Sequence, residues 1–187
     1  MASDKANIEQ FDRTANDSKQ WAMRAEDLHT ASQVLRDKVT SLKFDIENDP
    51  AGAVRDMKYA GLTFQSAMLQ GFSIEAFLKA YWLVQGNKVA EDGHYNIPSI
   101  KHDSHDLPSI AVGVGFTLST DEREVLTRLS LIVSSYGRYP ITKRWQHNPL
   151  TPDQNGIPHR LSWNNQDHTT AEAIIERLTK PTAASHA

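Results

Sequence analysis

Cationic and aromatic side chains alternate in one stretch of the chain, from residue 138 to residue 167. The stretch contains four prolines and has no helical period, and irregular segments of this length are commonly functional. Cations neutralise phosphates and rings stack on unpaired bases, so this alternation is typical of sites for single-stranded RNA. The side chains that we predict to contact nucleic acid are Arg138, Tyr139, Lys143, Trp145 and Trp163. The alternative is that the rings attach a long loop to the rest of the fold.

Arginine and histidine are the residue types here that suit cleavage of RNA without a metal. Such a reaction needs a base for the ribose 2′-hydroxyl and cations that stabilise the charged phosphorane. The candidate catalytic residues are Arg144, His147, Arg160 and His168, with His105 as a further relay. The chain has no cysteine, which excludes thiolate nucleophiles, and its only glycine pair near a helix lacks the spacing of a phosphate-binding loop. We expect no metal and no cofactor.

Two further groups of polar residues have competing interpretations. Glu75 and Lys79 are four residues apart in an otherwise apolar segment, in the orientation that favours an ion pair on a helix. They form either an exposed surface pair or a structural device at an interface. In the segment 102–106, Asp106 or Ser104 is expected to cap a helix beside a structural His105. The alternatives are a metal-binding histidine pair and a catalytic His105.

Apolar periodicity and capping signals indicate the elements that position these residues. The patterns predict helices over 17–44, from about 54 to 86, over 107–112, from Ser119 to Tyr136, and from Thr169 to Pro181. No strand pair is expected. The fold prediction is therefore all-α, an up-and-down bundle of four to five helices with a long irregular loop before the last helix. We expect a single domain over 1–187, with an N-terminal arm (1–15), the loop (138–167) and a frayed tail (181–187).

Composition and charge limit the classes of function. The 187 residues carry a net charge of −3, which does not suit a protein whose whole surface binds nucleic acid. Between residues 125 and 166, however, the sequence contains five basic residues and only one acidic residue, and a local anion site requires such an excess of positive charge. The longest apolar segment is interrupted by charged residues, and no apolar leader precedes it. We therefore expect a cytoplasmic protein with no membrane association.

Three segments in this order resemble the HEPN superfamily of prokaryotic helical domains. They are the helix from Phe72 to Tyr81, the Ser104–Leu107 segment, and a helix ending in Gly137–Pro140. The resemblance covers roughly residues 58–140. It implies a helical bundle, a homodimer, and a role in RNA cleavage, in defence, or in a toxin–antitoxin pair with a partner such as a nucleotidyltransferase.

Active members of that superfamily carry an arginine followed, after four to six residues, by a histidine near the start of a late helix. The only strict match in this chain is Arg24 with His29, in the first predicted long helix, and about one match is expected by chance. Enzymatic activity is therefore left open. The first hypothesis is an RNA-directed domain that binds or cleaves RNA. The alternative is a non-catalytic dimeric module that docks a partner protein, such as a nucleotidyltransferase or an antitoxin.

Overall fold

The computed structural model describes residues 2–48, 53–96, 105–136 and 163–184. Its helices are α1 (Ala2–Ala15), α2 (Ser18–Asn48), α3 (Ala53–Val84), α4 (Leu107–Gly113), α5 (Thr120–Leu131) and α6 (Asn165–Ala184). A short π-helix, η1 (Ile132–Tyr136), continues α5, and a hairpin of two-residue strands, β1 (Ala90–Glu91) and β2 (His94–Tyr95), follows α3. The all-α fold class is confirmed. None of the described helices combines the length and apolar character needed to cross a membrane.

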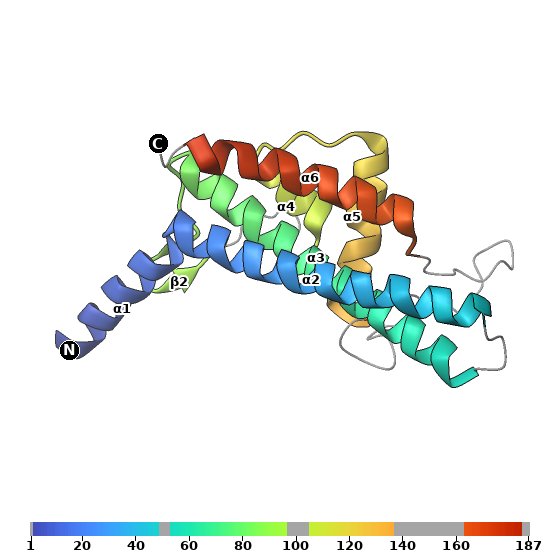
Figure 1. The fold of residues 1–187 in the computed structure, drawn as a ribbon. Helices are drawn as coiled ribbons and strands as arrows, with labels where there is room; N and C mark the ends of the chain where they lie inside the picture. The colour runs from blue at the N-terminus through green and yellow to red at the C-terminus, as the bar shows by residue number, and fades with distance from the viewer. Residues whose placement is uncertain (1, 49–52, 97–104, 137–162, 185–187) are drawn as a thin grey trace, which may run out of the picture.

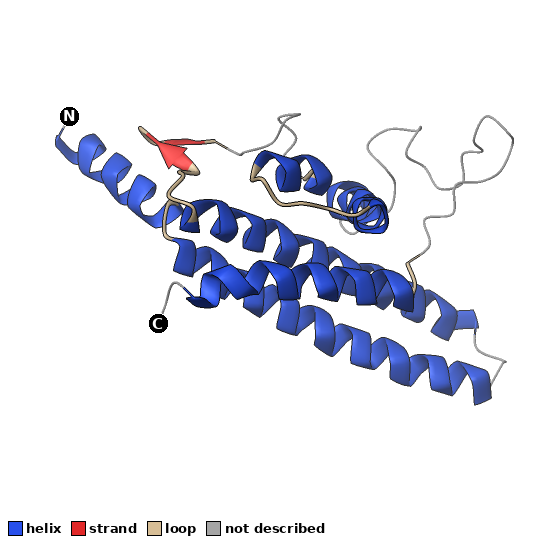
Figure 2. Cartoon of the chain, turned by 90° about the horizontal axis from the view of Figure 1, so that it is seen from above, coloured by secondary structure: helices blue, strands red, loops and turns tan. Residues whose placement is uncertain are grey.

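The two longest helices, α2 and α3, lie antiparallel along almost their whole length, and α6 packs along α3 (Figure 1). Helix α5 crosses this layer steeply: it stands upright in Figure 1 and is seen end-on in Figure 2. Helix α1 projects from the end of the bundle beside the hairpin. Most of the core therefore lies between α3 and the helices α4, α5 and α6.

Small side chains allow α2 and α3 to approach closely. Ser32 and Ser66 each donate a hydroxyl hydrogen bond of 2.9 Å to the other's backbone carbonyl. Ser73 does the same to the carbonyl of Ala25, at 2.8 Å. These three serines are buried, so each hydroxyl has to be bonded inside the protein. The contacts of Ser66 with Ser32 and of Ser73 with Ala25 fix the register between the two helices.

Gly71 marks a second close approach, between α3 and η1. A Cβ atom at this position would lie 2.5 Å from Cγ2 of Val133. That separation is far below van der Waals contact, so any side chain here would push α3 away from η1.

Side-chain caps set the starts of three helices. Asp106 caps α4 by accepting a hydrogen bond from the Ser109 amide, and Ser119 and Glu122 form a capping box at α5, as predicted. Helix α6 begins at Asn165, earlier than the sequence patterns suggested. The Asn164 carboxamide accepts hydrogen bonds from the first-turn amides, and Asp167 accepts one from the Asn164 amide.

The segment predicted as an N-terminal arm is helical over α1. Three sequence-based predictions on the elements are wrong. A strand pair exists at β1 and β2, where none was expected. The loop before the last helix ends by residue 164, because of the Asn164 cap. Helix α6 also continues through Pro181 to Ala184, because a proline removes one helical hydrogen bond without forcing the helix to end in its final turn. The strands were missed because two residues are too few to show an alternating pattern.

Candidate functional site

An ion pair between Glu75 and Lys79 lies inside the protein on α3. Both side chains are less than 10% exposed, so the prediction of a solvent-exposed pair does not hold. Burial by itself would raise the pKa of the Glu75 carboxyl, but hydrogen bonds from His105 and Lys79 and the Lys79 charge outweigh it and hold that pKa below its usual range. Glu75 therefore remains a carboxylate in the interior.

His105, which follows the hairpin in the sequence, completes this group. Its Nδ1 atom lies 3.0 Å from Oε2 of Glu75, while Lys79 donates to the other carboxylate oxygen. The ring packs edge-on against Phe72, with centroids 5.9 Å apart, and Asp106, the next residue, caps α4. A carboxylate accepts only, so Nδ1 carries a hydrogen in this contact.

Aromatic rings from two other elements surround the Lys79 ammonium group. Its Nζ lies 4.7 Å from the centre of the Trp21 ring and 5.5 Å from that of Tyr95. Burial lowers the pKa of Lys79, but the Glu75 charge and Tyr95 raise it by more than burial lowers it, so the lysine stays charged. For the Tyr95 hydroxyl, burial has the opposite effect and raises the pKa.

The hairpin that carries Tyr95 is attached to the bundle by the turn between α1 and α2. The Asn16 side chain accepts hydrogen bonds from the amides of Val89 and Ala90 and donates one to the Ala90 carbonyl. Asp12 accepts a further bond from the Gly93 amide. These contacts fix the position of β2, and hence of Tyr95 over Lys79.

A cavity of about 270 Å³ opens beside the group and is named here the Phe72 hollow. The residues that matter for its chemistry are Trp21, Arg24, Phe72, Glu75 and Lys79. Two rings, an arginine and the Glu75 carboxylate thus line one hollow, and His105 contacts two of these lining residues, Phe72 and Glu75. In a carboxylate–imidazole pair the carboxylate orients the ring and stabilises the imidazolium ion, which allows the histidine to act as a base.

A second histidine, His168, lies in a different environment between α6 and α3. Its Nε2 accepts a 2.8 Å hydrogen bond from the indole of Trp163, and its Nδ1 lies 3.0 Å from Oε1 of Gln70. Burial, and next the charge of Arg36, lower the pKa of His168 to about 4. A ring with both nitrogens engaged and no charge fits a structural histidine. The catalytic role predicted for His168 and the nucleic-acid contact predicted for Trp163 therefore do not suit these positions.

A polar chain extends from this second histidine to α2. Gln70 donates to Glu172, which also lies 3.2 Å from Nε2 of His29. His29 thus faces α6, whereas Arg24 faces the Phe72 hollow. The arginine and histidine of the strict sequence match do not share a site, because residues five apart lie on different faces of a helix.

Most of the loop residues proposed from the sequence lie outside the described residues, so their predicted roles stay predictions. They are Arg138, Tyr139, Lys143, Arg144, Trp145, His147 and Arg160.

Sequence reasoning did not associate Trp21, Arg24 and Tyr95 with Glu75. The sequence pattern assigned Trp21 to an apolar stripe and Arg24 to the charged face opposite it, and Tyr95 is in a segment with no periodic signal. The one available hint was the spacing of an aromatic and a cationic residue one helical turn apart. Their relation to α3 required the tertiary structure.

Comparisons of this chain with protein-family models, with curated proteins and with solved structures find no match. The assignment of a function to the group at Glu75 and His105 therefore rests on its own geometry.

Proposed function

We propose that the protein is an RNA-directed, HEPN-like domain that binds single-stranded RNA and cleaves it without a metal, with His105 as the base. The observation that carries the proposal is the contact between Nδ1 of His105 and the buried carboxylate of Glu75, beside a hollow lined by Trp21, Arg24 and Phe72. Glu75 and His105 come from the first two segments that resemble that superfamily, so these segments meet at one chemical site.

In the proposed reaction, Nε2 of His105 takes the proton of a ribose 2′-hydroxyl. The 2′-oxygen attacks the adjacent phosphorus, the bond from phosphorus to the 5′-oxygen breaks, and water supplies a proton to the leaving oxygen. The products are a 2′,3′-cyclic phosphate and a 5′-hydroxyl. Glu75 stabilises the imidazolium ion, and Lys79 keeps Glu75 ionised through its second oxygen.

Recognition of RNA is assigned to the hollow. A base that enters it would stack against Trp21 or Phe72, and the Arg24 guanidinium would neutralise a phosphate at its edge. The cations of the segment 138–167 remain predicted as further phosphate contacts. Because ring stacking tolerates every base, we expect little sequence preference.

The decisive experiment compares His105→Ala with His94→Ala, since His94 is an exposed histidine on β2. A labelled single-stranded RNA is incubated with each variant in the presence of a chelator, and the cleavage rate is followed on gels. We expect His105→Ala to slow cleavage by about 10²–10⁴-fold, the usual contribution of a general base, while RNA binding and His94→Ala activity remain. A 2′-deoxy substitution at the cleaved nucleotide should abolish the reaction.

Equal cleavage by His105→Ala and the unaltered protein would remove His105 from the mechanism. Loss of RNA retention even at low salt, with every variant folded by circular dichroism, would instead exclude RNA as the ligand of the described site.

A second candidate function, a non-catalytic dimeric interaction module, is supported by two apolar residues on the surface of α2. Met23 and Val34 are about 60% exposed and eleven residues apart, so they lie on one face of the helix. Apolar side chains on one face suit a partner helix, from a second copy or another protein. Replacing both with glutamate should convert a dimer to a monomer in light scattering. An unchanged molecular mass of the double variant would show that this face is not the dimer interface.

A further inference from the structure

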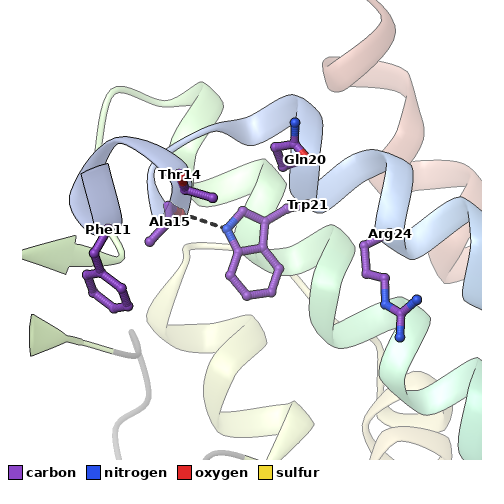
Figure 3. A pocket seen from close by; sticks show the side chains of 6 residues that line it. All are labelled: Phe11, Thr14, Ala15, Gln20, Trp21 and Arg24. Carbon is purple, nitrogen blue, oxygen red and sulfur yellow. Dashed lines mark hydrogen bonds between the residues drawn. The ribbon is translucent and has the colours of Figure 1, made fainter. Parts of the chain in front are cut away.

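A second cavity, named here the Phe11 hollow, lies between α1 and α2 and also has Trp21 in its lining. It has a volume of about 280 Å³ and is lined by Phe11, Thr14, Ala15, Gln20, Trp21 and Arg24. In Figure 3 the rings of Phe11 and Trp21 point the same way from two helices, and Arg24 lies beyond Trp21. The two hollows are nearly equal in size and share Trp21 and Arg24.

Trp21, which lines both hollows, is held in place by several contacts. Its indole nitrogen donates a 2.7 Å hydrogen bond to the carbonyl of Ala15, drawn as a dashed line in Figure 3. Its ring stacks on Tyr95 with centroids 6.2 Å apart, and the Lys79 ammonium lies against it. A ring fixed in this way offers a stacking surface without a large loss of side-chain entropy on binding.

Arg24 is the cation that both hollows share. It follows Trp21 by three residues, and so lies about one turn further along the same side of α2. Its side chain is exposed, and within the described residues it forms no ion pair with a carboxylate. A guanidinium in this state can accept a phosphate in two parallel hydrogen bonds.

We propose that the two hollows bind two consecutive unpaired nucleotides of one RNA strand, with one base in each hollow and the phosphate between them on Arg24. This inference rests on the proposed function and specifies its substrate as a single-stranded dinucleotide step. Each hollow is smaller than the 300–1,000 Å³ typical of sites for drug-sized ligands, which suits a single base. Each also has one aromatic residue of its own, Phe11 or Phe72, besides the shared Trp21.

The alternating order of ring, cation and ring is what a nucleic-acid strand requires. Bases stack on rings while the backbone charge is neutralised between them. An apolar peptide could fill the same two hollows, but it would not need the arginine at their junction. The two ligands differ in salt dependence, because phosphate contacts release counterions and apolar contacts do not.

The test measures binding of a fluorescent single-stranded RNA by anisotropy for Phe11→Ala, Phe11→Trp and Val112→Ala. Val112→Ala is the control, because Val112 is an exposed apolar residue like Phe11 but lies on α4 and lines neither hollow. We expect Phe11→Ala to weaken binding by about 5- to 150-fold, the equivalent of one lost stacked base. Phe11→Trp should restore affinity, and Val112→Ala should leave it unchanged.

A second measurement tests the shared phosphate. For Arg24→Gln, the slope of log affinity against log salt should decrease by about 0.7, the value for one phosphate of a single strand. In the unaltered protein, an RNA lacking one base should bind about as weakly as the intact RNA binds to Phe11→Ala.

The outcomes separate this inference from the proposed function. RNA binding that is insensitive to Phe11→Ala, or an unchanged salt slope for Arg24→Gln, overturns the two-nucleotide arrangement and leaves cleavage at His105 standing. The absence of RNA binding by the unaltered protein, together with affinity for apolar peptides, overturns both.

Discussion

Two histidines, His105 and His168, contact different residues of α3, and the contacted residues differ in charge. Nδ1 of His105 meets the carboxylate of Glu75, whereas Nδ1 of His168 meets the carboxamide of Gln70, at 3.0 Å in both cases. The His105 side chain is 23% exposed, and it contacts Phe72 and Glu75, which line a hollow. His168 is buried, and the Trp163 indole bonds to its second nitrogen.

The difference lies in the partner that each ring meets, a carboxylate for His105 and an amide for His168. A carboxylate stabilises the positive charge that a ring acquires when it takes a proton. An amide and an indole offer no such stabilisation, and burial penalises the charge, so His168 remains neutral. The predictions below test this contrast, beginning with the largest expected effect.

Removal of Glu75 should be the most damaging single change. Glu75→Ala leaves Lys79 as a buried charge without its partner, which costs about 3–5 kcal/mol in the free energy of unfolding. That is a large share of the 5–15 kcal/mol that stabilises a typical protein. Guanidinium unfolding measures the change. The double variant Glu75→Met, Lys79→Met is the control and should lose much less, and an equal loss in both would mean that the charge is not the cause.

His168 should make stability depend on pH in mild acid. Its pKa is about 4 in the folded state against 6.5 when unfolded. Its contribution, on the order of 3 kcal/mol, is therefore complete above pH 6.5 and is lost as the pH falls towards 4. Between pH 6.5 and pH 5 the unaltered protein should lose about 1.5 kcal/mol from this group.

The matched variant for this test is His168→Gln, which cannot titrate. It should show a flatter stability profile from pH 6.5 to pH 5 in unfolding curves. This window lies above the titration of Glu75, whose lowered pKa confines its own stability loss to pH values below 4.5. Parallel profiles for the two proteins would contradict a depressed pKa at His168.

Trp163→Phe should have an intermediate effect on the second group. It removes the indole donor and leaves Nε2 of His168 buried without a partner, which costs about 1–3 kcal/mol. The RNA cleavage proposed above does not involve this indole, so its rate at pH 7 should be that of the unaltered protein once the variant is folded. A cleavage defect as large as that of His105→Ala would contradict the assignment of the base to His105, because Trp163 contacts His168.

Asp106→Ala should have the smallest effect on stability. It removes the cap of α4, which is worth about 1 kcal/mol. Because Asp106 adjoins His105, the loss should also loosen the His105 ring, and the proposed RNA cleavage should then decrease more than RNA binding. Asp106→Asn, which keeps a capping oxygen, should recover both properties. Failure of Asn to recover them would show that the charge, and not the cap, is required.

The sequence alone determined the features that depend on neighbouring residues. The capping box at Ser119 and the cap at Asp106 were predicted because their hydrogen bonds span only three residues. The end of α3 near Gly86 was predicted for a similar reason: this glycine adopts a positive φ, which other residues rarely do. The all-α class followed from apolar periodicity over long segments.

Tertiary structure decided which polar residues are buried and which meet. Glu75 and Lys79 could be assigned to one face of a helix from their spacing, but their burial depends on Trp21, Tyr95 and His105, which come from three other segments. Likewise, His168 and His105 are the same residue type in the sequence. They differ in the groups that the fold brings to them: Gln70, 98 residues away, contacts His168, and Glu75, 30 residues away, contacts His105. Such contacts are decided by tertiary structure, because the energy of a buried charge is set by its neighbours in space.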